Sequence, residues 1–274
     1  MAIGSKFIDL NDQIAVVTGA GKGIGRGIAR ELAEAGADVI VADMDLESAN
    51  SVSEEIEKIG RESIALETDV TDQVSTDSMI AGVIKRFGRV DILVNNAGVG
   101  GGAGWTTRNV PTPDDWDACF KVNVLGIVHT TQSVESHMID RKYGKIVNIA
   151  SQAGRRGGGR AGADDFSHYA ASKASAINVT QAWAYKLAGY GINVNSVCPG
   201  HIWTPLSINI RERRLIAVGD SNITGRQIFE ELIEDIVPLG REQTPEDIGK
   251  AVAFLASDRA KNIVGQALNV DGGV

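Results

Sequence analysis

Short apolar runs alternate with longer amphipathic stretches along almost the whole chain. Runs such as VDILVNN and GKIVNIA are almost continuously apolar, which indicates strands buried on both faces, as in a parallel sheet. The longer stretches repeat apolar residues at helical spacing, and several are followed by a glycine that stops a helix. Strands are predicted at residues 14–18, 38–42, 63–67, 90–94, 145–150, 192–198 and 266–270, and helices at residues 23–35, 46–59, 72–87, 113–139, 167–188 and 245–256.

The alternation of strands and helices predicts the fold class. Right-handed βαβ crossovers are the economical way to connect parallel strands, so we expect an α/β fold with a doubly wound, Rossmann-like sheet of seven parallel strands flanked by helices. No change in composition marks a linker, and residues 1–274 are expected to form one domain. Residues 205–236 mix apolar residues with charges and are predicted to form a mobile substrate lid, although an ordinary amphipathic surface helix pair fits the same pattern.

Composition and charge narrow the possible functions. Of the 274 residues, 43% are apolar and 23% are charged, as is usual for a globular protein. The net charge of −8 argues against nucleic-acid binding, which needs a basic face. Cys119 and Cys198 lie far apart in apolar surroundings and are expected to be reduced core residues. Since no apolar run is as long as a membrane span or a signal peptide, we expect a cytoplasmic protein without a membrane partner.

The segment TGAGKGIG at residues 18–25 lies directly after the first predicted strand and opens the first predicted helix. Glycines there let the backbone approach a pyrophosphate, and the helix N-terminus supplies N–H groups and a positive dipole. A flexible turn has the same composition, but the strand before it and the helix after it favour a nucleotide.

Asp43 ends the second predicted strand, about 20 residues further on, where a carboxylate accepts hydrogen bonds from the adenosine ribose hydroxyls. This carboxylate would also repel a 2′-phosphate, which favours NAD over NADP. Lys22 argues weakly the other way, because a basic residue in the glycine loop could meet that phosphate.

Tyr169 and Lys173 are four residues apart in a predicted helix and therefore share one face of it. A lysine ammonium beside a phenol favours the phenolate, so we expect the pKa of Tyr169 to fall below its usual value of about 10. Such a tyrosine can donate and accept protons near neutral pH. Taken alone, the spacing also fits a surface tyrosine and a surface lysine that share a helix face by chance.

The combination of motifs is more specific than any one of them. It comprises Thr18-Gly-x-x-x-Gly-x-Gly25, Asn95-Asn96-Ala97-Gly98, Asn123, Ser151, Tyr169-x-x-x-Lys173 and Pro199-Gly200, in this order. With these motifs the chain resembles a classical short-chain dehydrogenase/reductase from about Leu10 to its end. The resemblance implies that Tyr169 exchanges a proton with the substrate hydroxyl and that Lys173 lowers the pKa of Tyr169 and binds the nicotinamide ribose. It also implies that Ser151 holds the substrate oxygen and that Asn123 supports a water leading from Lys173 to solvent.

The same resemblance implies a cofactor site and an assembly. The implied NAD-binding residues are Gly19, Gly21, Lys22, Gly23, Ile24, Gly25, Asp43, Asp69, Val70, Asn95, Ala97, Gly98, Tyr169, Lys173, Pro199, Gly200, Ile202 and Thr204. Without the resemblance, Asn95–Gly98 fits a structural turn, Ser151 a capping residue and Asn123 a local backbone partner. The helices that carry Asn123 and Tyr169 pair between subunits in the family, so a homotetramer is implied.

The chain departs from the family between Ser151 and Tyr169, where it holds about five additional residues. Arg155, Arg156 and Arg160 lie in this segment and could clamp a carboxylate, phosphate or sulfonate. Two aspartates in the same segment favour a solvated mixed-charge loop equally well. The candidate substrate residues are Ser151, Arg155, Arg156 and Trp203, and Trp105 also lies near the predicted mouth, although a tryptophan is more commonly a core residue. No histidine has metal-like partners, and no metal is expected.

These observations predict an NAD-dependent oxidoreductase that interconverts a secondary alcohol and a ketone, both small molecules. Polyols, sugars, hydroxy acids and cyclic alcohols are all compatible substrates, and the arginines favour a polar or anionic one. An NADPH-dependent 3-oxoacyl-type ketoreductase is the alternative within the same fold. A non-catalytic nucleotide-binding regulator is the alternative outside enzymes, and it would be expected if the Asn–Ser–Tyr–Lys set were incomplete.

Overall fold

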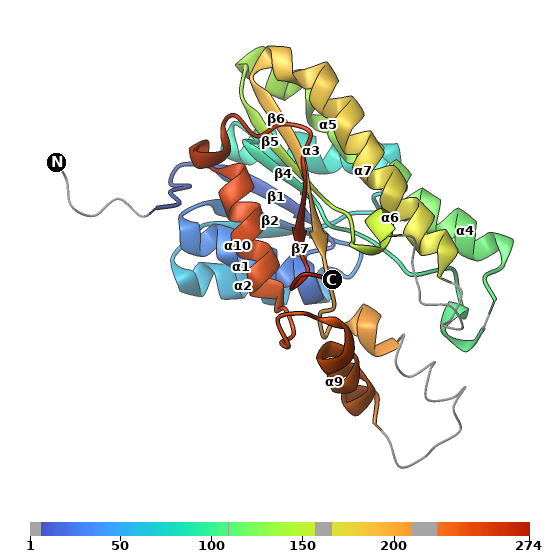
Figure 1. The fold of residues 1–274 in the computed structure, drawn as a ribbon. Helices are drawn as coiled ribbons and strands as arrows, with labels where there is room; N and C mark the ends of the chain where they lie inside the picture. Colours follow the sequence, from blue (N-terminus) through green and yellow to red (C-terminus); the bar gives the residue numbers. More distant parts are fainter. Residues whose placement is uncertain (1–6, 109, 157–165, 210–223) are drawn as a thin grey trace.

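The computed structural model of the protein describes residues 7–108, 110–156, 166–209 and 224–274. Its centre is a seven-stranded sheet in the order β3-β2-β1-β4-β5-β6-β7, with every neighbouring pair parallel (Figure 1). The predicted fold class is therefore confirmed. The strands are β1 (Ile14–Thr18), β2 (Asp38–Asp43), β3 (Ser63–Glu67), β4 (Ile92–Asn95), β5 (Gly144–Ile149), β6 (Ile192–Pro199) and β7 (Ala267–Val270).

Helices connect the strands and cover both faces of the sheet. They are α1 (Gly23–Ala35), α2 (Leu46–Ile59), α3 (Gln73–Phe87), α4 (Pro113–Phe120), α5 (Gly126–Arg141), α6 (Ala153–Arg156), α7 (Ser167–Leu187), α9 (Gly225–Ile236) and α10 (Pro245–Ala256). Short 3₁₀ turns lie at η1 (Trp105–Thr107), η3 (Ala188–Tyr190) and η4 (Asp258–Ala260). A further helix begins at Pro205, and residues 205–209 of it are described.

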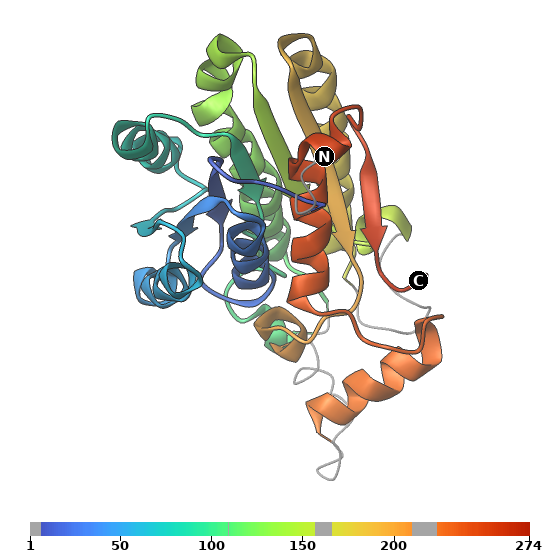
Figure 2. The ribbon, with the colours of Figure 1, turned by 90° about the vertical axis from the view of Figure 1, so that its left-hand side faces the viewer.

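The apolar residues of each strand are divided between two helical layers. In β1, Ala15 and Val17 pack with residues of α1, α2 and α10, whereas Ile14 and Val16 pack with α3, α5 and α7. Figure 2 looks onto the face of the sheet that α1 and α10 cover, and α5 and α7 lie behind the sheet in this view. Burial on both faces explains why these strands read as continuous apolar runs.

The predicted helix over residues 113–139 is continuous but not uniform. Between α4 and α5 the chain forms a π-helical turn, η2 (Lys121–Leu125), which contains Asn123. In this turn Asn123 is fully buried, and its amide is bound to the backbone of Val99. Turns of this kind are rare and frequent at functional sites, and apolar periodicity does not reveal them.

Strand order creates a crevice at one edge of the sheet. The chain builds outward from β1 through β2 to β3, and then returns to place β4 on the other side of β1. The loops that follow β1 and β4 therefore lead away to opposite sides, and ligands of open α/β sheets bind in the crevice between them. Within the described residues, no helix is long and apolar enough to cross a membrane, and no three metal-ligand side chains cluster.

Candidate active site

The loop after β1 is shaped by glycines that leave no room for a side chain. A Cβ atom at Gly25 would collide with the carbonyl oxygen of Gly19, and one at Gly21 would lie 3.0 Å from a carboxylate oxygen of Asp43. Helix α1 then begins without a side-chain cap or an acidic residue in its first turn. By contrast, α2, α3 and α10 each have a side-chain cap. Backbone N–H groups that no side chain caps suit the phosphates of a dinucleotide, so the residues fit the expected cofactor.

The loop after β4 is bound to the glycine loop. Asn96 donates from Nδ2 to the carbonyl oxygens of Thr18 and Gly19, both at 2.9 Å. In return, the hydroxyl of Thr18 accepts from the backbone N–H groups of Asn96 (3.1 Å) and Ala97 (3.2 Å). No role was predicted for Asn96 from the sequence. The two adjacent asparagines were a visible signal in the sequence, but Thr18, to which Asn96 binds, lies 78 residues away in the chain.

Asp43 faces the glycine loop. Its Oδ2 accepts from the backbone N–H of Gly21 at 2.9 Å, and its Oδ1 accepts from that of Asp45 at 3.0 Å. Asp45 in turn forms an ion pair with Lys22, with 2.6 Å between Nζ and Oδ2. Two carboxylates therefore stand at the end of β2, and the one cation of the glycine loop is paired with the second of them.

Asn95 differs from its expected place. Its side chain lies in the core and not toward the crevice, because Nδ2 donates to Asn148 Oδ1 at 2.8 Å and Oδ1 accepts from the hydroxyl of Thr130. Asn148 continues this buried chain by donating to Thr180 on α7 at 2.9 Å. The side chain of Asn95 thus ties β4 to the helices beneath it, which leaves only its backbone to line the crevice.

The structure brings Ser151, Tyr169, Lys173 and Asn123 together. The side chain of Ser151, just after β5, lies beside the phenol of Tyr169, and Lys173 Nζ lies 5.8 Å from the centroid of that ring. Gly98 marks the centre of the group, since a Cβ atom there would lie 3.4 Å from Lys173 Nζ and 3.2 Å from Asn123 Oδ1. Tyr169 is only partly buried, whereas the other three side chains are buried.

The expected lowering of the Tyr169 pKa is wrong. Burial raises the pKa of Tyr169 to about 12 and outweighs the lowering effect of the hydrogen bond with Ser151. Burial also lowers the pKa of the Lys173 ammonium group to about 8, and its Nζ donates to the carbonyl oxygen of Ile149 at 2.8 Å. The four-residue spacing shows that the two groups share a helix face, but it does not show how deeply they are buried.

Asn123 connects the β4 loop to helix α7. Its Oδ1 accepts from the N–H of Val99 at 2.9 Å, and its Nδ2 donates to the carbonyl oxygen of Val99 at 3.0 Å and to the hydroxyl of Ser172 at 2.9 Å. Ser172 donates onward to the carbonyl oxygen of Tyr169 at 2.7 Å. Asn123 therefore holds the loop and the Tyr169 helix in a fixed relation.

The remaining predicted cofactor residues follow β3 and β6. Thr204 lies over the start of α1, since a Cβ atom at Gly23 would be 3.5 Å from the Cβ atom of Thr204. Ile202 is buried beside it, and Gly200 leaves no room for a side chain against Asp271. On the other side of the crevice, Asp69 accepts from the backbone of Thr71, and Val70 is buried against α5.

The predicted substrate residues other than Ser151 are placed less favourably for a role at Tyr169. Arg155 Nη1 donates to the carbonyl oxygen of Ala267 at 2.7 Å, so this guanidinium is bound to β7. Arg156 is exposed, and Arg160 lies outside the described residues. The ring of Trp203 packs against Phe229 of α9, with 5.2 Å between centroids. Trp203 therefore packs as a core residue, which is the alternative to a substrate-binding role. Much of the predicted lid, residues 210–223, also lies outside the described residues.

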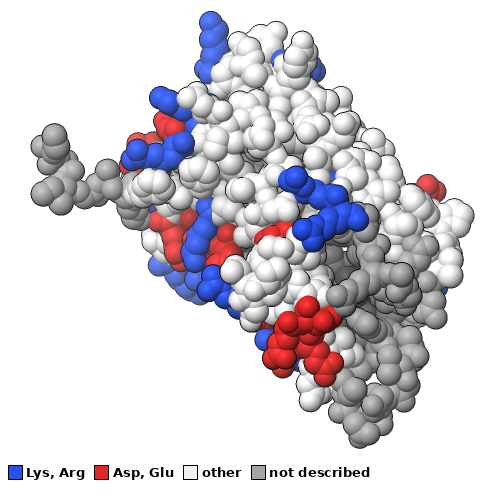
Figure 3. Space-filling model, viewed as in Figure 1, with Lys and Arg blue, Asp and Glu red and all other residues white. Residues whose placement is uncertain are grey.

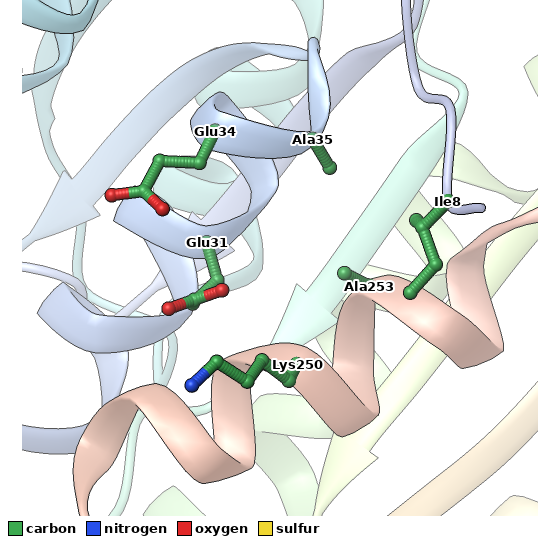
Figure 4. A pocket seen from close by; sticks show the side chains of 6 residues that line it. All are labelled: Ile8, Glu31, Glu34, Ala35, Lys250 and Ala253. Atoms are coloured by element: carbon green, nitrogen blue, oxygen red, sulfur yellow. The ribbon is translucent and has the colours of Figure 1, made fainter. Parts of the chain in front are cut away.

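A depression of about 220 Å³ lies elsewhere, between α1, α10 and the start of the described chain (Figure 4). Burial raises the pKa of Glu31, which lines it, and the nearby Glu34 adds to this rise. None of the predicted site residues lies in this depression. Its lining residues are Ile8, Glu31, Glu34, Ala35, Lys250 and Ala253.

The fold and the site together define a class: a doubly wound α/β protein with a phosphate-binding loop at the switch point of its sheet and a Ser–Tyr–Lys group beside that loop. Residues 19–274 match the family model described as enoyl-(acyl carrier protein) reductase. The chain belongs to the classical short-chain dehydrogenase/reductase family of oxidoreductases.

Relatives of known function match over almost their entire length. The chain is 37% identical over 280 residues to cyclohexanol dehydrogenase of Rhodococcus sp. (strain TK6), which covers 97% of each chain. It is 34% identical over 269 residues to 3-oxoacyl-(acyl-carrier-protein) reductase of Thermotoga maritima, which covers 97% of this chain and 98% of the relative. A solved structure of 7α-hydroxysteroid dehydrogenase complexed with NADH and 7-oxo glycochenodeoxycholic acid has a TM-score of 0.82 and 33% identity, and the match covers 99% of this chain and 98% of that one.

Proposed function

We propose that this protein is an NAD-dependent oxidoreductase that interconverts a secondary alcohol and a ketone. The observation that carries the proposal is the placement of Tyr169 beside the hydroxyl of Ser151 and the ammonium of Lys173, at the same edge of the sheet as the glycine loop. The relatives support the same reaction type, since they include a cyclohexanol dehydrogenase and a steroid dehydrogenase.

In this proposal the phenol of Tyr169 moves the proton of the reaction. Ser151 holds the substrate oxygen by a hydrogen bond, so that this oxygen lies within reach of the phenol. During oxidation the phenolate form of Tyr169 takes the hydroxyl proton and becomes the phenol, and during reduction the phenol form gives its proton to the carbonyl oxygen and becomes the phenolate. Lys173, when protonated, stabilises the negative charge that the phenol carries in between. Bound NAD would accept or supply the hydride.

The cofactor would be held by the residues that line the crevice. Glycines 19 to 25 would approach the diphosphate closely, with Thr204 above them, and Asp43 would accept from the ribose hydroxyls. We propose NAD over NADP because Asp43 and Asp45 place two negative charges at the ribose end. Lys22, which argued for NADP, already pairs with Asp45.

A second candidate is NADPH-dependent reduction of a 3-oxoacyl group. The reductase of Thermotoga maritima and the description of the matching family model support this alternative. It requires a cation to meet the 2′-phosphate, and the pairing of Lys22 with Asp45 removes the candidate that the sequence offered. We therefore place it second.

Three further expectations remain proposals. A homotetramer is supported by large apolar side chains exposed on the helices that would pair, among them Leu125 (47% exposed) and Tyr185 (94% exposed). A cytoplasmic location is supported by two cysteines that are both free. We also propose that residues 1–274 act as one dinucleotide-binding catalytic unit in which residues 205–236 cover the substrate; α9 and the helix that begins at Pro205 are the described parts of that cover.

The test of the proposed function is Tyr169→Phe. We expect this change to lower kcat for alcohol oxidation with NAD⁺ by at least about 100-fold, because the proton acceptor is removed while the ring and its packing are kept. Binding of NADH, followed by its fluorescence, should change little, and this measurement shows that the variant is folded. Activity that survives in Tyr169→Phe would refute the mechanism.

A further inference from the structure

The partly exposed surface beside Tyr169 is aromatic. Phe166, at the start of α7, stacks on the ring of Tyr169 with 4.6 Å between centroids and 26° between planes. Trp105, from the loop after β4, lies 5.8 Å from Phe166. Leu206 approaches the same place, because a Cβ atom at Gly100 would lie within 3.0 Å of both Leu206 Cδ1 and the ring of Trp105. We call the two aromatic rings of Trp105 and Phe166, together with the aliphatic side chain of Leu206 beside them, the aromatic wall.

The aromatic wall is held in place by buried polar contacts. Asp115 accepts from the backbone N–H of Gly102 (2.9 Å) and from Arg108 Nη2 (2.6 Å), so both sides of Trp105 in the chain are anchored. His168 Nε2 is hydrogen-bonded to the carbonyl oxygen of Gly100 at 2.8 Å. These contacts fix the position of Trp105 in the loop, whereas an ordinary surface tryptophan would not need such anchoring.

Among the described residues beside the aromatic wall, several polar groups are already engaged, and the two nitrogens without a hydrogen-bond partner, His168 Nδ1 and Arg108 Nε, are buried away from the surface. This arrangement argues against a polar or anionic substrate. Asp115 and the Nε2 atom of His168 bind the loop itself, and the ring of His168 is covered by Phe166 and Trp116. Arg155 is bound to β7. In addition, acidic side chains gather over α9 (Figure 3), and such a surface disfavours an approaching anion. The exposed acidic residues of α9 are Glu230, Glu231, Glu234 and Asp235.

From this geometry we infer that the substrate is an uncharged secondary alcohol whose reacting carbon belongs to, or adjoins, an apolar ring. The ring lies against Trp105 and Phe166, while its oxygen reaches Ser151 and Tyr169. Trp105 is thereby the main specificity-determining residue. Partly exposed aromatic faces bind such rings by area burial and by offset stacking. This inference rests on the proposed alcohol oxidation and adds the substrate class to it.

The test compares three ring alcohols of similar size with NAD⁺: cyclohexanol, 1,2-cyclohexanediol and 4-hydroxycyclohexanecarboxylate. For the unmodified protein we expect kcat/KM to be highest for cyclohexanol, by about tenfold over the carboxylate. Trp105→Ala should lower kcat/KM for cyclohexanol by about tenfold, mainly by raising KM. The same variant should change kcat/KM for a small acyclic alcohol such as 2-propanol by less than about twofold. Trp105→Phe should restore most of the loss.

The controls separate this inference from the proposed function. Tyr190→Ala removes an aromatic ring that is 47% exposed in η3, outside the aromatic wall and outside the helices that would pair, and should change none of these values. Binding of NADH by Trp105→Ala shows that the variant is folded, and Trp105→Leu offers a second variant if it is not. A preference for the carboxylate, or an unchanged KM for cyclohexanol in Trp105→Ala, overturns the substrate class while oxidation still depends on Tyr169. Absence of any Tyr169-dependent oxidation overturns the proposed function instead.

Discussion

At the residue scale, the ion pair between Lys22 and Asp45 shows how one contact reverses the meaning of a motif. A lysine in the glycine loop is a natural partner for a 2′-phosphate, and the sequence alone leaves this possibility open. In the structure its Nζ lies 2.6 Å from Asp45, which also caps α2 by accepting from the N–H of Ser48. Both side chains are well exposed, so the pair adds little to stability, and its consequence lies in cofactor choice.

We predict that Asp45→Asn relaxes the preference for NAD. Asparagine keeps the helix cap but removes one negative charge and releases Lys22, which can then meet a 2′-phosphate. The ratio of kcat/KM for NADP⁺ to that for NAD⁺ should rise by about tenfold, and the rise should shrink at high salt.

The matched control for this prediction is Glu47→Gln, which removes a charge from the first turn of the same helix. It should change the ratio far less, because Glu47 is the weakest of the three carboxylates that raise the pKa of Lys22, whereas Asp45 is hydrogen-bonded to Lys22. An equal effect of the two variants would mean that net charge, and not the ion pair, sets the preference.

The pKa of Tyr169 is the residue-scale property that sequence reasoning predicted in the wrong direction. Sequence gives the identity and spacing of the two groups, and from these a lowered pKa follows. The value depends on how far the folded chain buries the phenol, on whose ring Phe166 stacks. The rise to about 12 means that the phenol of the free protein holds its proton across the physiological range.

At the element scale, the regular elements were predictable because each one carries its own signal. The strand at Ile14–Thr18 and the helices at Gly23–Ala35 and Leu46–Ile59 have the predicted bounds, since an apolar run or periodic stretch ends in each case at a turn or a glycine. The loop between β4 and α4 was not predictable in the same way. Its shape is fixed by Asp115 through contacts with residues up to 13 positions earlier.

We predict that Asp115→Asn destabilises the protein by about 2 kcal/mol at pH 7, because buried donors lose a charged acceptor. Burial disfavours the ionised carboxylate, but hydrogen bonds from Thr112, Arg108 and Gly102 outweigh this effect and hold the pKa of Asp115 well below its usual range. A carboxyl with a lowered pKa in the folded state binds fewer protons than in the unfolded state, so it stabilises the fold above about pH 4. This contribution is lost as pH falls, and the deficit of the variant should therefore shrink toward pH 3.

Urea denaturation of both proteins at pH 7, 5 and 3 measures this difference. Asp117→Asn changes an exposed carboxylate on the same helix and should shift the free energy of unfolding by less than about 0.5 kcal/mol. A deficit of Asp115→Asn that stays constant from pH 7 to pH 3 would show that the ionised carboxylate is not what anchors the loop.

At the scale of the whole molecule, the two ends of the chain together build the cofactor half of the sheet. Helix α10, near the C-terminus, packs so closely on α1 that a Cβ atom at Gly27 would lie 2.5 Å from the Cβ atom of Pro245. Thr204, from the loop after β6, covers the start of the same helix. Sequence motifs located the glycine loop but not α10 and Thr204, the distant segments that pack on it. The only trace of close packing between helices in the sequence is a single glycine such as Gly27, which is too little to identify the partner helix.

Because the cofactor site is built from both ends of the fold, binding of the cofactor should stabilise the molecule as a whole. NAD⁺ at about 100 times its Kd adds about 2.7 kcal/mol to the free energy of unfolding, which for a chain of this size corresponds to a rise in Tm of about 5 °C. We predict this rise with NAD⁺ and less than about 1 °C with NADP⁺ at the same concentration, since Asp43 repels the 2′-phosphate.

Gly21→Ala should reduce the NAD⁺ effect, because its Cβ atom would lie 3.0 Å from Asp43 Oδ2 and would displace the carboxylate that accepts from the ribose. Scanning calorimetry with each nucleotide measures the shift, and an equal rise with NADP⁺ would contradict the role of Asp43.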